Sequence, residues 1–63
     1  MSEFAVDRLL DAKEAAELLH VKVSWVREET RQGRMPHVRL GRYRRYDRAE
    51  LLAWLEKHKE GGS

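Results

Sequence analysis

The chain has 63 residues, of which 38% are charged and none is cysteine, so it offers little room for an enclosed catalytic cavity and no disulfide framework or thiolate metal site. Its formal charge of +2 is unevenly spread, because residues 1–33 carry a net −2, residues 34–45 a net +5 and residues 47–63 a net −1. These features argue against an enzyme and predict a concentrated basic patch of the kind that binds phosphate.

The chain opens with residues 1–8, which lack the basic start and the apolar stretch of a signal peptide. No apolar run in the sequence approaches the roughly 20 residues that a membrane-spanning helix needs. The lack of cysteine fits a reducing compartment. We therefore expect a soluble, cytoplasmic protein with no membrane association.

A first helix is predicted over residues 12–20. Asp11 and Glu14 have the spacing of a capping box, in which the two side chains bond each other's backbone amides. An apolar stripe follows at helical spacing and consists of Ala12, Ala15, Ala16 and Leu19. Because alanine is small, another helix can approach closely, so this helix is expected to act as a packed support.

A second helix is predicted over residues 23–32, directly after a tight connection formed by Val21 and Lys22. Gly33 is expected to end it by adopting the left-handed conformation that other residues resist. The two helices and their short connection therefore form a helix-turn-helix pair.

A two-stranded hairpin is predicted next. Pro36 forces its predecessor into extended geometry, and apolar and aromatic residues bracket a two-residue turn at Gly41 and Arg42. The bracketing residues are Val38, Leu40, Tyr43 and Tyr46. We expect both tyrosines to pack beside a small core rather than to stack on bases.

A third helix is predicted from Asp47, whose spacing to Glu50 repeats the capping-box pattern, to about residue 58. Its apolar residues are expected to face the core and are Leu51, Leu52, Trp54 and Leu55. Residues 61–63, Gly-Gly-Ser, have the composition of a flexible end or a cloning remnant. The prediction is a single domain over residues 1–63, with its core at about 9–58 and flexible ends, mainly α with a small β-hairpin wing.

The second helix separates an apolar side from a polar one when it is projected at 100° per residue. Val23, Val26 and Thr30 lie on the first side, and the second side carries Ser24, Arg27, Glu28 and Arg31. Arginine can pair with guanine edges and glutamate can accept from cytosine, so the polar side is predicted to read bases. Ser24 and the helix N-terminus would add hydrogen bonds to phosphate, and Lys22 at the helix start is also predicted to bind DNA. The alternative is a solvated face with local salt bridges.

The hairpin carries four arginines and no acidic residue, namely Arg39, Arg42, Arg44 and Arg45. Charge of one sign on a compact element predicts contact with phosphates that flank the site. With about four to six phosphates neutralised, the logarithm of the binding constant should fall with log salt at a slope of roughly −4 to −5. The alternative is a charged edge that prevents sheet-to-sheet aggregation.

Several other polar residues do not form a chemical site in this sequence. His20, His37 and His58 lack the spacing and the carboxylate neighbours of a zinc site. Glu28 and Glu29 are adjacent in a helix, so they point about 100° apart and cannot cooperate as acid and base. We therefore expect no metal, no cofactor and no catalytic residue.

The order of helix, turn, helix, Gly-x-x-Pro, wing and capped helix over residues 9–57 resembles the excisionase-like branch of the MerR-type winged helix-turn-helix proteins. The resemblance is carried by residues 10–19 (LDAKEAAELL), 25–27 (WVR) and 33–42 (GRMPHVRLGR). Lys22 stands where that family often has a serine cap, and Glu29 where an apolar residue is frequent. The resemblance implies that the second helix enters the major groove through Arg27, Glu28 and Arg31, and that the wing contacts an adjacent groove or the backbone through Arg39, Arg42 and Arg44.

The resulting hypothesis is a sequence-specific duplex DNA-binding protein of a bacterial host cell. By resemblance it would be a phage or mobile-element excisionase, a recombination directionality factor that binds cooperatively near attachment sites, bends DNA and directs a tyrosine integrase towards excision. One alternative is a small AlpA-like transcriptional regulator. Another, of a different class, is a protein-interaction adaptor whose basic hairpin docks an acidic partner.

Overall fold

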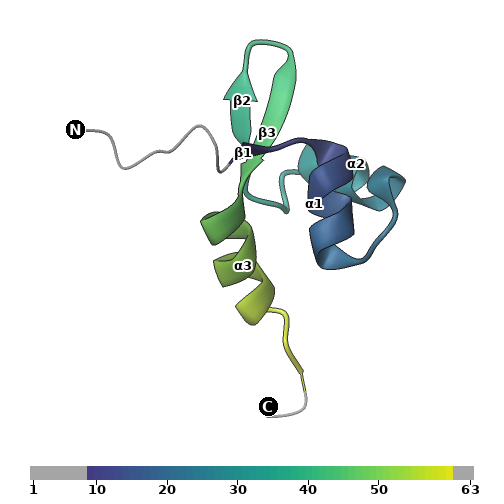
Figure 1. Ribbon diagram of the computed structural model, residues 1–63, viewed down its shortest axis with the longest axis vertical. Coiled ribbons are helices and arrows are strands. Elements are labelled where there is room, and N and C mark those ends of the chain that lie inside the picture. The colour runs from purple at the N-terminus through teal and green to yellow at the C-terminus, as the bar shows by residue number, and fades with distance from the viewer. Residues whose placement is uncertain (1–8, 61–63) are drawn as a thin grey trace, which may run out of the picture.

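The computed structural model describes residues 9–60, so residues 1–8 and 61–63, on which the signal-peptide and flexible-end predictions rest, lie outside the described residues. The elements in chain order are β1 (Leu9–Leu10), α1 (Ala12–Leu19), α2 (Val23–Arg31), β2 (Val38–Leu40), β3 (Tyr43–Asp47) and α3 (Arg48–Glu56). The β2–β3 hairpin projects at one end of the molecule and α3 at the other, with α1 and α2 beside the base of the hairpin (Figure 1). Three helices and a small antiparallel sheet form a winged helix-turn-helix, as predicted.

The sheet has three strands in the order β1-β3-β2, whereas the sequence predicted only the β2–β3 hairpin. Leu9 pairs with Asp47 and Leu10 with Tyr46, so β1 lies along the side of β3 away from β2. Two residues are too few to show the alternation of apolar and polar side chains that marks a strand, so β1 was not predicted. Its pairing makes β3 the central strand.

Helix α1 begins with the predicted capping box. The Asp11 amide donates to Glu14 Oε1 at 2.9 Å and the Glu14 amide donates to Asp11 Oδ1 at 2.8 Å. The helix ends at Leu19, because His20 adopts the left-handed conformation with φ 59° and the Val21 amide turns back to the Ala16 carbonyl at 3.0 Å. This non-glycine residue performs the role that glycine usually has.

Helix α2 begins without a side-chain cap, since the lysine at position 22 has no acceptor for the first helical amides. It ends at Arg31, and Gly33, two residues later, adopts the predicted left-handed conformation with φ 76°. The Gly33 amide donates to the Thr30 carbonyl at 3.0 Å and the Arg34 amide to the Glu29 carbonyl at 2.9 Å. These two bonds form a Schellman motif, which redirects the chain from α2 into the hairpin.

The hydrophobic core is small and joins α1, α2, β3 and α3. Its buried side chains are Ala15, Ala16, Val26, Met35, Tyr46 and Leu51. The two alanines let α1 and α2 lie close together, as expected of a packed support. Met35 was not predicted, because it lies in a loop before Pro36 where no periodicity identifies a core position.

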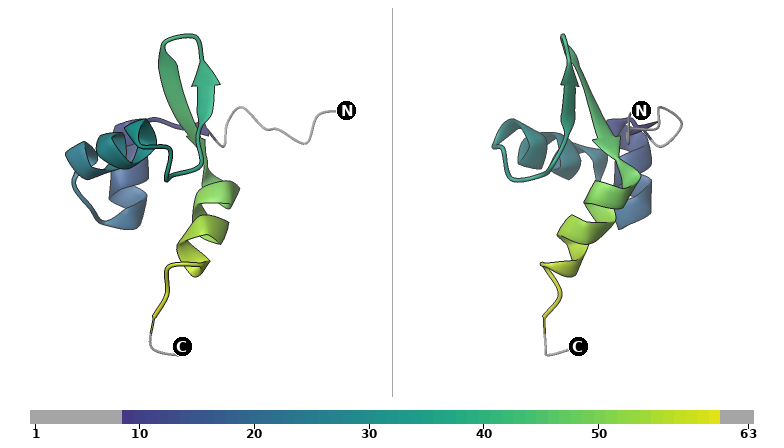
Figure 2. Two further views of the ribbon diagram at one scale, coloured as in Figure 1. Left: turned by 180° about the vertical axis from the view of Figure 1, so that it is seen from behind. Right: turned by 90° about the vertical axis from the view of Figure 1, so that its left-hand side faces the viewer.

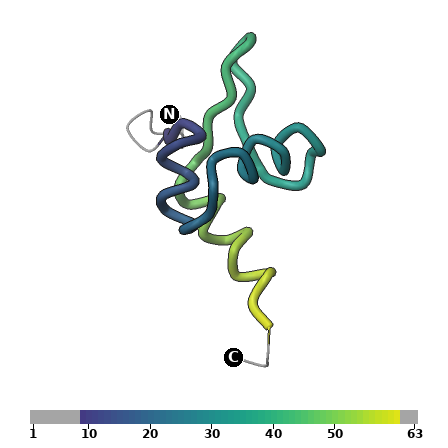
Figure 3. Tube along the Cα trace, turned by 90° about the vertical axis from the view of Figure 1, so that its right-hand side faces the viewer, coloured from purple at the N-terminus to yellow at the C-terminus, as the bar shows by residue number. Residues whose placement is uncertain are grey.

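The prediction for α3 was only partly correct. Asp47 accepts bonds from the Ala49 and Glu50 amides, so it caps the helix, which ends at Glu56 rather than near residue 58. Leu51 is fully buried, but Leu52 and Leu55 remain 37% and 38% exposed instead of facing the core. Helix α3 extends away from the other elements (Figures 2 and 3), and beyond Leu51 only Trp54 of its predicted core residues packs against the core.

The second turn of α3 is attached through Trp54. Its indole Nε1 donates to the Arg34 carbonyl at 3.0 Å, and its ring packs half-buried against the core.

Over residues 9–60, no helix is both long enough and apolar enough to cross a membrane.

Candidate nucleic-acid interface

The orientation of α2 is set by two buried residues, Val26 and Thr30, which are 0% and 4% exposed. The Thr30 hydroxyl donates to the Val26 carbonyl at 2.8 Å and lies 2.5 Å from the hydroxyl of Tyr46 on β3. A hydroxyl has one proton, so Tyr46 is the donor to Thr30 Oγ1. This bond connects α2 directly to β3, which is the central strand of the sheet and one of the two strands of the wing.

The opposite side of α2 is exposed, as predicted. Its exposed side chains are Ser24, Arg27, Glu28 and Arg31, and Lys22 is exposed at the helix start. We call the first four the α2 face. Because the Lys22 side chain makes no cap, the first amides of α2 remain open to an anionic group.

Part of the α2 face is internally paired. Glu28 accepts hydrogen bonds from Arg31 Nε at 3.2 Å and Nη2 at 2.6 Å, and from Gln32 Nε2 at 2.8 Å. The bonds from Gln32 and Arg31 hold the pKa of the Glu28 carboxyl below its usual value. The local salt bridge of the alternative interpretation therefore exists at this pair, whereas Arg27 makes no ion pair with any residue in the 9–60 range.

The wing turns at Gly41, with φ 61°, and Arg42, as predicted. Arg39 lies opposite Arg44 across the two strands, while Arg45 lies opposite Val38. Because side chains alternate along a strand, Arg39 and Arg44 share one face of the hairpin and Arg45 starts from the other. The predicted wing residues are thus divided between two faces.

Tyr43 organises the arginines near the tip of the wing. It is 50% exposed, so the expectation that it packs in the core is wrong, whereas Tyr46, at 1%, is buried as expected. The guanidinium carbons of Arg42 and Arg45 each lie 5.3 Å from the centre of the Tyr43 ring, within cation–π range. Tyr43 lies directly after the turn, where too few core residues are near to bury its ring, and two guanidinium groups lie against the ring instead.

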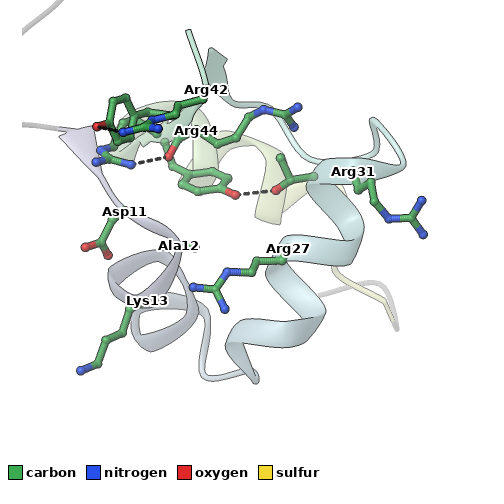
Figure 4. A pocket seen from close by; sticks show the side chains of 11 residues that line it. Asp11, Ala12, Lys13, Arg27, Arg31, Arg42 and Arg44 are labelled. Atoms are coloured by element: carbon green, nitrogen blue, oxygen red, sulfur yellow. Dashed lines mark hydrogen bonds between the residues drawn. The ribbon is translucent and has the colours of Figure 1, made fainter. Parts of the chain in front are cut away.

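An open cleft of about 690 Å³ lies between α1, α2 and the wing (Figure 4). Arg27 extends across it from α2 towards α1, whereas Arg31 points outwards from the end of α2. Six cationic side chains line the cleft, namely Lys13, Arg27, Arg31, Arg42, Arg44 and Arg45. The single lining carboxylate, Asp11, is engaged as the cap of α1.

The cleft brings together five of the nine residues predicted to bind DNA. Arg27 and Arg31 come from α2, and the other three come from the wing. The four that do not line it are Lys22, Ser24, Glu28 and Arg39. Lys13 was missed, because the sequence showed only a polar position on a supporting helix and no signal that its first turn faces the wing.

One arginine of the basic segment is neutralised locally. Arg34 donates to both Glu29 oxygens at 2.9 Å, and Glu29 is only 14% exposed in its side chain. The pair raises the pKa of Arg34 and lowers that of Glu29. This ion pair explains how a glutamate occupies a position where the resembled family often has an apolar residue.

Among residues 9–60, no three His, Asp or Glu side chains gather where a metal ion could bind.

Comparison with known protein families supports this geometry. A family model described as a helix-turn-helix domain matches residues 9–59, which is most of the chain. The chain belongs to this family. It is therefore a DNA-binding helix-turn-helix protein, with duplex DNA as its partner. No curated protein and no solved structure matches it.

Proposed function

We propose that this helix-turn-helix protein is an excisionase, a recombination directionality factor of a phage or mobile element. Several copies would bind cooperatively near an attachment site, bend the DNA and direct a tyrosine integrase towards excision. The chain itself would catalyse no step. The resemblance of residues 9–57 to excisionases supports the proposal, together with the surface described above.

The observation that carries the proposal is the cationic cleft between α2 and the wing. Helix α2 would lie in the major groove, with the wing on the flanking backbone or the next groove. The DNA strand between those two places would then pass along the cleft, where Arg27, Arg44 and Lys13 can neutralise its phosphates. The buried hydrogen bond between Thr30 and Tyr46 would keep α2 and the wing at a fixed angle to each other.

The small α2 face favours binding by several copies. Only four exposed side chains form it, and two of these, Glu28 and Arg31, are paired with each other. One copy would therefore discriminate few base pairs, and specific recognition would need neighbouring copies whose effects multiply. Bending a site of 20–30 base pairs costs about 1–6 kcal/mol, which the added contacts of each copy would offset.

The experiment that tests this proposal is selection of bound duplexes from a random library by the purified protein. Closely spaced direct repeats, with bending of the selected duplex measured by end-to-end energy transfer, are expected of the excisionase. A single inverted repeat on straight DNA would instead favour the AlpA-like regulator. No enrichment and no salt-dependent binding would contradict DNA recognition and favour the adaptor.

Two variants and a control sharpen the test. Arg42→Glu and Arg44→Glu should each weaken binding to all duplexes alike, because the wing is proposed to contact phosphate. Lys57→Glu makes the same charge reversal in the exposed residue that follows α3, at the opposite end of the molecule from the wing (Figure 1). Equal weakening by the control would show that only total charge matters.

A further inference from the structure

Glu28 and Arg31 form a bidentate salt bridge on the exposed side of α2. Arg31 approaches Glu28 with the edge formed by Nε and Nη2, and both carboxylate oxygens accept bonds from it. Gln32 Nε2 adds a third bond to Oε2. Glu28 thus already accepts three hydrogen bonds from its own helix, which leaves only one of the roughly four carboxylate lone pairs, on Oε1, for a base amino group.

The same contact leaves the other end of Arg31 free. A guanidinium has five N–H donors, and Glu28 uses one on Nε and one on Nη2. Both protons of Nη1 and the second proton of Nη2 make no bond with any residue in the 9–60 range. Two adjacent nitrogens that present donors in one plane match the O6 and N7 acceptors of guanine.

The position of Arg31 makes that end accessible. Its side chain is 69% exposed, and although Arg31 is among the residues that line the cleft, its guanidinium points outwards from the end of α2 (Figure 4). An exposed arginine normally loses rotamer freedom when it binds, which weakens the contact. Because Glu28 already restricts the guanidinium, less of that freedom remains to be lost.

We propose that Arg31 recognises a guanine through its Nη1–Nη2 end and that Glu28 is a positioning residue that holds Arg31, rather than a reader of cytosine. This inference rests on the proposed DNA-binding function and assigns the roles within the α2 face. Arg27 lies one turn earlier and has no carboxylate partner among the described residues, so it serves as an internal comparison.

The experiment uses the selected duplex and its three single-base-pair variants at each guanine in the site, with affinities measured by fluorescence anisotropy. Arg31→Ala should lower the preference for one guanine about tenfold. Glu28→Ala should lower the preference for the same guanine by a comparable factor. It should also raise affinity for unrelated duplexes, because it removes a negative charge beside the phosphates. The double variant should lose no more than either single variant.

Loss of selectivity with a gain in general affinity distinguishes positioning from a folding defect, which would weaken both. Arg31→Lys keeps the charge but lacks the planar fork, so it should lose the guanine preference while retaining affinity for unrelated duplexes. Arg27→Ala should leave that guanine preference intact. Glu56→Ala removes the comparable exposed i,i+3 pair between the last residue of α3 and Lys59, and it should change neither quantity.

Three results would overturn the inference. If Glu28→Ala relaxes the preference at a different base pair from Arg31→Ala, Glu28 reads a base in its own right. If neither variant changes selectivity although the unmodified protein selects a site, only this inference fails. If the unmodified protein binds no duplex, both the inference and the proposed function fail.

Discussion

Replacing Tyr46 with phenylalanine is expected to destabilise the protein by about 1–2 kcal/mol. The ring stays in its buried place, but Thr30 Oγ1 loses the donor 2.5 Å away and keeps only its own bond to the Val26 carbonyl. A net hydrogen bond contributes about 0.5–1.5 kcal/mol, and the buried acceptor left unpaired adds to the loss. Since a loss of 1 kcal/mol lowers the Tm of a domain of this size by roughly 4–8 °C, Tm should fall by about 4–16 °C in calorimetry.

Tyr43→Phe is the matched control, because it removes the same hydroxyl from a ring on the same strand that is 50% exposed. It should lower the free energy of unfolding by less than about 0.5 kcal/mol. Thr30→Val combined with Tyr46→Phe should cost less than the two single changes added together, because the residues share one bond. Equal Tm values for the two phenylalanine variants would refute the structural role assigned to the Thr30–Tyr46 bond.

Three further predictions concern stability. Leu51→Ala should cost about 2–4 kcal/mol in denaturant unfolding, whereas Leu55→Ala, one turn further along and 38% exposed, should cost under about 1.5 kcal/mol; similar costs would mean that α3 is covered along its length. His20→Gly should raise the free energy of unfolding by about 0.5–1 kcal/mol, because it relieves a left-handed conformation, and a loss of stability would contradict this. The lowered pKa of Glu28 means that its stabilising contribution is present above the unfolded value of about 4.3 and is lost as pH falls through the lower folded value. The stability difference between the unmodified protein and Glu28→Gln should therefore shrink in acid unfolding curves taken below pH about 4.3, and a difference that grows there would contradict the pairing.

Local chemistry is what the sequence predicted well. The capping box between Asp11 and Glu14, the left-handed Gly33 and the turn at Gly41 each depend on a few neighbouring residues, so their pattern is readable without the fold. The two faces of α2 were also correct, because helical periodicity alone separates Val26 from Arg27.

Features that depend on distant contacts were missed or wrong. β1 forms because Leu9 and Leu10 pair with residues of β3 that are distant in the sequence. Lys13 lines the cleft because α1 packs beside the wing. The apolar residues of α3 were expected to face the core, but Leu52 and Leu55 are 37% and 38% exposed. The pairing of Glu28 with Arg31 was foreseen as a general alternative, yet its geometry needed coordinates.

The most direct test of DNA binding by the cleft is the salt dependence of duplex affinity, measured by anisotropy between about 50 and 300 mM salt. The unmodified protein should show a slope of log binding constant against log salt of roughly −4 to −5. Lys13→Ala and Arg44→Ala should each make the slope less steep by about 1, because each removes one proposed phosphate contact, while Lys57→Ala should leave it unchanged. A slope near zero, or equal changes from all three variants, would contradict the account.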